Sequence, residues 1–321
     1  MSETTLRSVR EGLEEAGIEA AWSQWGALGA GTHRNGTPVS GIIDPEALLL
    51  LSLYLIPEER RLRDLIRWWA EVGSQLLSVQ RTKTLAKDFP ADTVERLRLY
   101  SYWAVEAGDR RWKKYAEKPE GTSGRERKGP EEPELRSPAP LILRLRAGFG
   151  VSAKADVLAF LLGNGEQAAT TKKVARATGY SRATVGGGLD DLSRGGFIRK
   201  ENGRPAEYRA PTEPWKALLF GHSSGKREED VGGSQSKTPE WRYWGQLFGF
   251  LARAREWTRK AESLSEYMAS TQARDLFEEF RWALEANRIQ VSVPSRYRGR
   301  DYLHGFLEDV ERAGRWIPEH L

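Results

Sequence analysis

Residues 171–210 read TKKVARATGYSRATVGGGLDDLSRGGFIRKENGRPAEYRA, and this stretch decides the fold of the middle of the chain. Its first part predicts a short helix over 172–178 that ends at Gly179, because glycine adopts the left-handed backbone of a tight turn at little cost. Ser181 predicts the start of a second helix over 182–194, since a serine side chain accepts a hydrogen bond from the first helical turn. Two helices separated by a tight turn are therefore expected.

A hairpin is predicted after these helices. The strand-like runs Phe197–Lys200 and Arg204–Ala210 flank Asn202-Gly203. Asn-Gly between such runs favours a two-residue turn, in which both residues have positive φ. Upstream, Ser152 predicts the start of another apolar helix. The expected order is helix, helix, tight turn, helix and hairpin.

The spacing inside the helix pair is specific. Ala175 is small where two helices must cross closely, and Val185, Leu189 and Leu192 follow the helical period on one face. The block resembles the winged helix-turn-helix family, of the kind found in MarR- and ArsR-like bacterial and archaeal regulators, over residues 152–210 only. The resemblance is carried by Thr171–Val185, by Leu189 and Leu192, by Gly196-Phe197-Ile198 and by the hairpin from Asn202 to Tyr208.

The resemblance implies a DNA-binding surface. In such modules the helix at 182–194 enters the major groove, and an arginine at the hairpin tip can enter the minor groove. Arg182 is the long donor near the start of that helix and would contact guanine. The residues expected to contact DNA are Lys172, Lys173, Arg176, Ser181, Arg182, Ala183, Thr184, Gly187, Arg199, Lys200, Arg204 and Arg209.

Three consecutive glycines depart from the pattern of the family. Gly186, Gly187 and Gly188 lie inside the helix expected to enter the groove, where long polar side chains are more usual. Each glycine costs roughly 0.5–1 kcal/mol of helix stability relative to alanine. The triplet either permits a very close approach to DNA or leaves a floppy helix that reads bases weakly.

The distribution of charge favours a polyanionic partner for this block. The chain has 50 Lys and Arg against 45 Asp and Glu, a net charge of +5. Residues 141–220 hold 13 of the bases and 7 of the acids, a balance of +6, so the other residues balance at −1. Such a local surplus suits contacts with phosphates, although a charge cluster alone is more often a solvated face.

Two segments dense in Pro, Gly and charge divide the chain. Neither holds enough apolar side chains to form a core, so both are expected to be exposed connectors. The division expected is a helical N-terminal domain at 1–116, a linker at 117–140, a winged helix-turn-helix domain at 141–220, a linker at 221–239 and a helical C-terminal domain at 240–321. The expected fold class is mainly α, with three helices and a β-hairpin wing between two helical blocks.

Both flanking blocks have helical patterns. Asp44-Pro45-Glu46 marks a helix start, with a capping acid before a proline at the first helical position. Ile289, Val291 and Val293 alternate with polar residues and predict one short strand. Six Trp precede residue 117 and are interpreted as core residues, the alternative being an aromatic ligand pocket: Trp22, Trp25, Trp68, Trp69, Trp103 and Trp112.

No catalytic or metal-binding pattern stands out. The chain has no Cys, and its four His lie far apart, at His33, His222, His304 and His320. These features exclude thiolate chemistry and argue against a local metal site. The glycine-rich segment 26–32 lacks the Lys-Ser/Thr that follows in a phosphate loop. We therefore expect no enzymatic activity, no cofactor and no metal.

The expected function is that of a DNA-binding transcriptional regulator. It would be a homodimer that binds double-stranded DNA and responds to an unknown small-molecule or protein effector. No run approaches the roughly 20 apolar residues of a membrane span, and the N-terminus lacks an apolar signal core, so a cytoplasmic location is expected. The alternative is an antitoxin-like or scaffold protein whose winged helix is a protein–protein interaction module.

Overall fold

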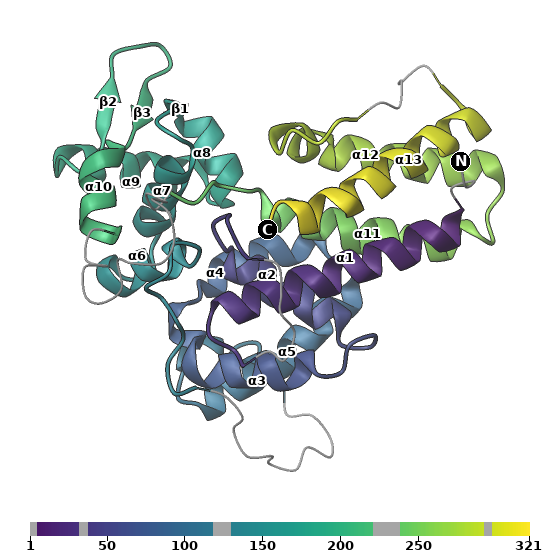
Figure 1. Ribbon diagram of the computed structural model, residues 1–321, viewed down its shortest axis with the longest axis horizontal. Helices are drawn as coiled ribbons and strands as arrows, with labels where there is room; N and C mark the ends of the chain where they lie inside the picture. Colours follow the sequence, from purple (N-terminus) through teal and green to yellow (C-terminus); the bar gives the residue numbers. More distant parts are fainter. Residues whose placement is uncertain (1–4, 32–37, 118–129, 221–237, 292–296) are drawn as a thin grey trace, which may run out of the picture.

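The computed structural model describes residues 5–31, 38–117, 130–220, 238–291 and 297–321 (Figure 1). Within these ranges the protein is mainly helical, with one small three-stranded antiparallel sheet, which confirms the expected mainly α class. No helix in the described ranges is both long and apolar enough to cross a membrane. The α-helices are α1 (Leu6–Ala27), α2 (Pro45–Leu55), α3 (Leu62–Val72), α4 (Val79–Leu85), α5 (Ala91–Glu106), α6 (Leu141–Phe149), α7 (Ala153–Gly163), α8 (Thr171–Thr178), α9 (Arg182–Arg194), α10 (Thr212–Phe220), α11 (Trp244–Ala261), α12 (Glu266–Ala286) and α13 (Gly299–Glu319).

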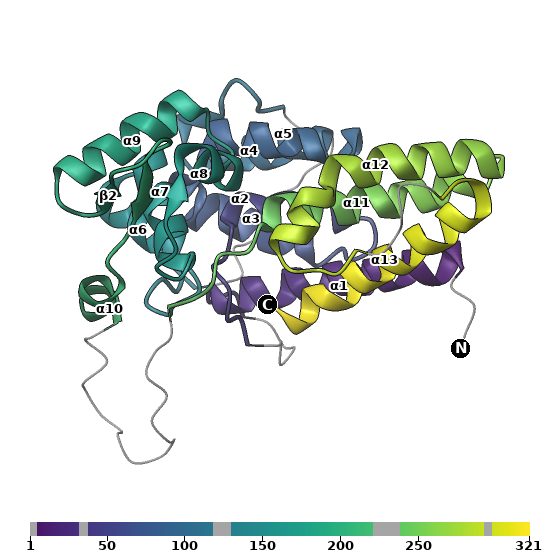
Figure 2. The same cartoon turned by 90° about the horizontal axis from the view of Figure 1, so that it is seen from above.

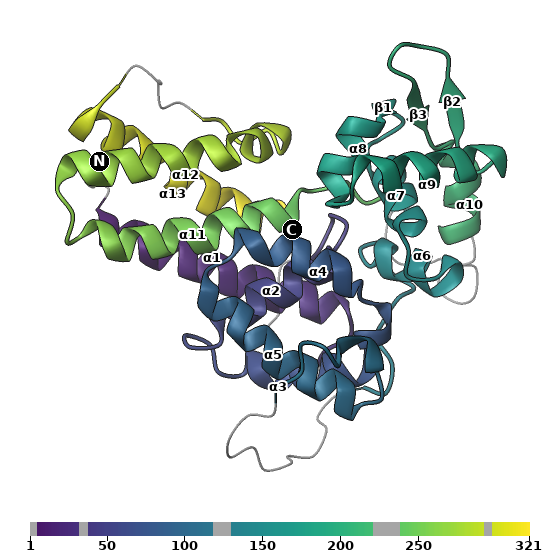
Figure 3. The same cartoon turned by 180° about the vertical axis from the view of Figure 1, so that it is seen from behind.

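Helices from the two ends of the chain share the larger of two hydrophobic cores. We call this body, formed by α1–α5 and α11–α13, the helical lobe. Helix α1 lies against α11 and α13, although more than 200 residues separate α1 from α11 (Figures 1 and 3). Trp25 of α1 is fully buried, and its ring lies 5.3 Å from that of Trp69 in an edge-to-face arrangement. The N- and C-terminal blocks thus form one core together.

The second core lies inside the middle of the chain. We call this body, formed by α6–α10 and the sheet, the central module. Its strands are β1 (Ala169–Thr170), β2 (Arg199–Glu201) and β3 (Glu207–Arg209), in the order β1-β3-β2 with Lys200 opposite Tyr208. Figure 2 shows α9 and α10 on opposite sides of the module. Val185, Leu189 and Leu192 of α9 are buried, as their spacing predicts.

The hairpin forms where the sequence predicts it, but its turn differs. Neither Asn202 nor Gly203 has a positive φ, and five residues join β2 to β3. Pro205, two residues after Gly203, has no backbone N–H to donate to a β-ladder. Pairing begins only at Glu207, opposite Glu201. The two-residue turn expected from Asn-Gly is therefore wrong.

In the flanking blocks, the expected helix start and the expected core tryptophans are found, but the expected strand is not. Asp44 caps α2 by accepting a hydrogen bond from the Ala47 N–H (3.1 Å), and Pro45 occupies the first helical position. The six Trp before residue 117 are all buried, which confirms their interpretation as core residues. The strand expected at 289–293 is wrong for its described part: Ile289 instead closes the end of α12, its N–H donating to the Leu284 carbonyl (2.9 Å). Val293 lies outside the described residues.

The two bodies are joined by short extended segments. Ile42 N–H donates to the Glu240 carbonyl (2.8 Å), and Trp241 N–H donates to the Gly163 carbonyl of α7 (2.9 Å). Residues 130–140 belong to the first expected connector and run along the helical lobe, where Trp68 donates to the Pro130 carbonyl (2.8 Å). Several of their side chains are exposed, those of Pro130, Glu131, Glu132, Glu134 and Arg136. The other residues of the two expected linkers, apart from Glu117, Thr238 and Pro239, lie outside the described ranges.

Candidate nucleic-acid interface

The first turn of α9 is exposed, and local interactions define its conformation. Gly179 has φ +75°, the left-handed conformation that ends α8. Ser181 caps α9 by accepting a hydrogen bond from the Thr184 N–H (3.1 Å). The side chains of Ser181, Arg182, Ala183 and Thr184 are exposed, whereas Val185 is completely buried. The sequence therefore presents one polar turn to solvent and anchors the helix directly behind it.

Four of the expected DNA-contacting cations are exposed and unpaired within the described part of the chain. Lys172 lies at the start of α8, Arg182 at the start of α9, and Arg199 and Arg204 in the hairpin. Lys173 is also free of carboxylates there and donates to the neutral side chain of Asn164 (3.1 Å). These five charges are available to an external anion.

The remaining hairpin cations pair with local acids, and one of these pairs joins the hairpin to α9. Lys200 contacts Asp190 of α9 (3.2 Å), and the Tyr208 hydroxyl also donates to Asp190 (3.4 Å). Arg209 pairs with Glu201 across the two strands. The hairpin and the exposed helix are therefore parts of one surface.

Arg176 has different surroundings from the other expected contacts. Its guanidinium lies over the ring of Trp282 in α12, 3.7 Å from the ring centroid. Burial lowers the pKa of Arg176, because the charged form loses hydration at the junction. Arg176 thus joins α8 to the helical lobe rather than standing free among the unpaired cations.

The glycine triplet does not interrupt α9. The helix is continuous from Arg182 to Arg194. A Cβ added to Gly187 would meet nothing within 4 Å, whereas one added to Gly188 would lie 3.7 Å from Lys154. Packing therefore does not require glycine at position 187, and its absent side chain leaves the helix backbone open to solvent.

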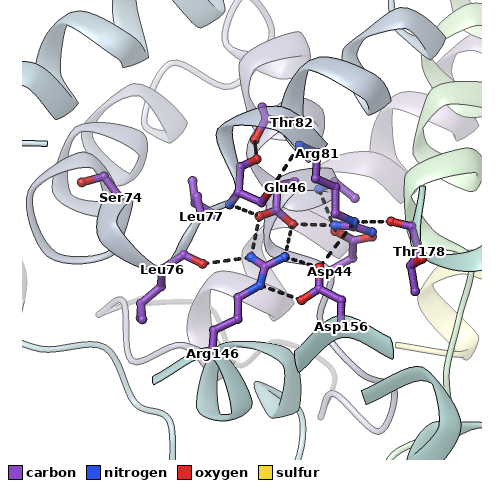
Figure 4. Close-up of polar contacts among 12 residues, drawn as sticks. Asp44, Glu46, Ser74, Leu76, Leu77, Arg81, Thr82, Arg146, Asp156 and Thr178 are labelled. Atoms are coloured by element: carbon purple, nitrogen blue, oxygen red, sulfur yellow. Dashed lines mark hydrogen bonds and ion pairs between the residues drawn. The ribbon is translucent and has the colours of Figure 1, made fainter. Parts of the chain in front are cut away.

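A buried network of charges lies where the central module meets the helical lobe (Figure 4). Its members were not expected from the sequence. Glu46 and Arg146 lie at its centre: Arg146 donates to both oxygens of Glu46 (2.5 and 3.1 Å) and to the Leu76 carbonyl (2.9 Å). Arg146 also forms a two-bond contact with Asp156, at 2.7 Å to each oxygen.

A second arginine completes the network. Arg81 donates to Asp44 (2.6 and 2.5 Å) and to Glu46 (2.5 Å). All five charged side chains are at most 5% exposed. Burial alone raises the pKa of Glu46, but Arg146 and Arg81 overcome that effect, so the net shift is downward and Glu46 is ionised.

This network reaches the turn in front of α9. Arg81 Nε donates to the Thr178 carbonyl (2.7 Å), and the Tyr180 hydroxyl donates to Asp156 (2.9 Å). Burial next to Asp156 raises the pKa of Tyr180, which keeps its hydroxyl protonated as a donor. Because every carboxylate oxygen of Asp44, Glu46 and Asp156 already accepts a hydrogen bond, we assign the network to positioning rather than to catalysis.

The sequence contains a signal for this network. Glu46, Arg146 and Asp156 each lie next to apolar runs, in PEALLLLSLYL of α2, LILRLR of α6 and DVLAFLLG of α7. A charge on the apolar side of a helix is rarely buried without a partner. The sequence shows that each must be paired, but it does not show which residues pair.

Metal chemistry finds no support in the described residues. Within those ranges, no group of three or more His, Asp or Glu is arranged to hold a metal ion. His304 lies 3.3 Å from Glu308 on the surface of α13. His33 and His222 lie outside the described residues.

Comparison with protein-family models, with curated proteins and with solved structures finds no match for this chain.

Proposed function

We propose that the protein is a DNA-binding transcriptional regulator whose central module is a winged helix-turn-helix. The observation that carries the proposal is the exposed first turn of α9, with Arg182 unpaired, beside a basic hairpin that contacts the same helix through Asp190. In this arrangement α9 reads the major groove and the hairpin is the wing. We also propose that it acts as a homodimer, since readers of this kind commonly pair over two half-sites.

The supporting residues divide by the contact they would make. Arg182 offers two donors to a guanine edge, and Ala183 offers a methyl group to a thymine. Ser181 and Thr184 suit phosphate oxygens. The unpaired Lys172 and Arg204 suit the backbone and the minor groove respectively. Direct base readout thus depends on the first turn of α9. Contact with the DNA backbone depends mainly on the residues around that turn.

The salt dependence of duplex binding tests this function. Lys172, Lys173, Arg182, Arg199 and Arg204 are free of carboxylates in the described part of the chain. On a random duplex, which offers Arg182 no selected guanine, about five phosphate contacts per protomer give a log–log slope near −4.5 for each protomer bound. Fluorescence anisotropy with a labelled random duplex between about 50 and about 200 mM salt measures that slope. The double variant Lys172→Ala/Arg204→Ala should reduce it by about two. Absence of binding, or binding insensitive to salt, rejects the proposal.

A second candidate function is a protein–protein interaction module. It is favoured by an aromatic cluster in the central module, where the rings of Phe149 and Phe197 lie 5.8 Å apart and each side chain is more than 40% exposed. Leu218 of α10 is 62% exposed. Exposed apolar patches of this kind mark protein contacts. A mobility shift with random duplex DNA separates the two functions, because an interaction module of this kind leaves the duplex unshifted.

A further inference from the structure

The helical lobe contains a cavity of about 930 Å³ that the DNA-binding proposal does not use. Its lining comes from the end of α2, the residues around the start of α5, and the facing sides of α11 and α12. No residue of the central module lines it. The volume is at the upper end of the range typical of small-molecule sites, roughly 300–1,000 Å³.

The cavity wall is rich in hydrogen-bond donors. Six basic and four acidic side chains line it. A guanidinium carries five N–H donors. Arg253 donates one of its hydrogen bonds to Glu279 (2.6 Å). Arg259 donates one to Glu58 (3.0 Å), and Lys87 is exposed without a hydrogen bond or ion pair in the described ranges. Donors therefore exceed acceptors, which suits a ligand with several negatively charged oxygens.

One arginine of the wall is fixed in place. Arg255 is 2% exposed and donates to Tyr54 (3.2 Å), to Glu58 (2.8 Å) and to Glu14. These contacts hold α11 against α1 and the end of α2. The position of Glu58, and through it of Arg259, is therefore set before any ligand arrives, which lowers the entropic cost of binding.

Aromatic side chains also contribute to the lining, beside Pro57, Pro90, Ala91, Gln272 and Leu276. Tyr54, Phe89 and Trp257 each border the cavity and are at most 5% exposed. Such a mixture of buried rings and guanidinium groups favours a planar, apolar body attached to an anionic group. Phosphate fits the charged part because its oxygens match the fork of arginine donors.

We propose that this cavity binds an organic phosphate with a planar ring, of the nucleotide class. Its anionic group contacts Lys87, Arg253 and Arg259, and its ring packs on the aromatic lining. If the proposed function holds, the ligand is the effector of the regulator. Its binding then changes the affinity for duplex DNA through α11 and α12, because Trp282 of α12 contacts Arg176 of the central module.

Isothermal titration calorimetry of the full chain with ATP tests the site without DNA. We expect a Kd below about 1 mM, and a loss of about tenfold or more in the variants Lys87→Ala and Arg259→Ala. The matched control is Arg281→Ala, which removes a half-buried arginine of α12 that pairs with Glu285 (2.8 Å) and does not line the cavity. Thermal melting of each variant confirms folding. No heat of binding, or equal affinity in all variants, overturns the site.

Two further ligands separate the parts of the proposal. Adenosine lacks the charge and tripolyphosphate lacks the ring, so each should bind about tenfold or more weakly than ATP. Tripolyphosphate that binds as tightly as ATP overturns the ring contact. Duplex binding is then measured with and without ATP. An unchanged affinity for the duplex overturns the role of the ligand as effector but not its binding site. Failure of duplex binding itself rejects the proposed function and leaves the calorimetric result intact.

Discussion

Arg176 and Arg182 are six residues apart and have opposite surroundings. Arg176 is held over Trp282, whereas Arg182 projects from the exposed first turn of α9. The difference arises from the turn at Gly179, which redirects the chain between them. The sequence predicted a DNA contact for both, a phosphate for Arg176 and a guanine for Arg182, because the partner that holds Arg176 lies more than 100 residues away.

Arg182→Ala should reduce sequence preference more than total affinity. A two-donor contact with guanine discriminates by roughly 1–3 kcal/mol, whereas the lost phosphate attraction affects every sequence equally. The measurement is competition between a selected duplex and random DNA. Arg194→Ala, at the other end of α9, is the control and should leave the preference unchanged. Equal losses on both duplexes would show that Arg182 contacts only the backbone.

Asp88 carries a pH dependence of stability. Burial first, and the nearby Glu279 second, raise its pKa from 3.8 to about 6. Since the folded state binds the proton more tightly than the unfolded chain, this carboxyl costs stability as pH rises from about 4 to above 6. Asp88→Asn should therefore raise the free energy of unfolding by about 2 kcal/mol at about pH 7.5 and change it little near pH 4. Urea unfolding at the two pH values checks this, and an equal change at both would contradict it.

Among the elements, α9 combines a buried aliphatic face with backbone that is exposed to solvent at Gly187. Its hydrophobic period predicts the buried face correctly, because that face depends only on spacing along one helix. The effect of the glycines could not be predicted in the same way. Whether Gly186, Gly187 and Gly188 break the helix depends on how firmly Val185 and Leu189 anchor it, and that is a property of the packed core.

Gly187→Ala separates helix stability from partner approach. The added Cβ meets nothing within 4 Å, so the substitution should stabilise the protein by about 0.5–1 kcal/mol. If the helix lies close against DNA, the same methyl group should weaken duplex binding by about fivefold or more. Gly148→Ala in α6 is the control, since its Cβ also meets nothing within 4 Å. Stabilisation with unchanged duplex affinity would argue against close approach at position 187.

The hairpin shows the limit of local rules. Asn202-Gly203 predicts that the chain reverses, and it does. The register depends instead on Pro205, whose missing N–H delays pairing until Glu207. The Asn-Gly dipeptide therefore predicted where the hairpin lies but not the length of its turn.

At the scale of the whole molecule, the buried charge network determines how the central module sits on the helical lobe. Arg146→Met should destabilise the protein by about 3–5 kcal/mol, because it leaves Glu46 and Asp156 buried without their main partner. Tyr180→Phe removes one hydrogen bond and should cost only about 1 kcal/mol. Calorimetric melting measures both, with Arg281→Met, at a half-buried arginine outside the network, as the control. A loss below about 1 kcal/mol in Arg146→Met would show that the network is dispensable.

The sequence predicted the helical character of all three blocks but not the way they assemble. Helical periodicity reports one buried face per helix and does not identify what covers it. Helix α13 packs against α1, yet nothing local in the sequence links the two helices across the intervening residues. The junction network likewise joins residues up to about 100 positions apart, such as Glu46 and Arg146.

The shared core of α1, α11 and α13 has a consequence for synthesis on the ribosome. The core of the central module is complete only with Trp241 and Tyr243, just before α11, so the module can fold while the rest of the chain is still growing. Helix α1 must wait for α11, which begins 217 residues after α1 ends. At ~5–20 residues per second that delay is roughly 10–40 s, during which the side of α1 that packs on α11 and α13, at Gly17 and Leu13, lacks its final cover and invites chaperone binding.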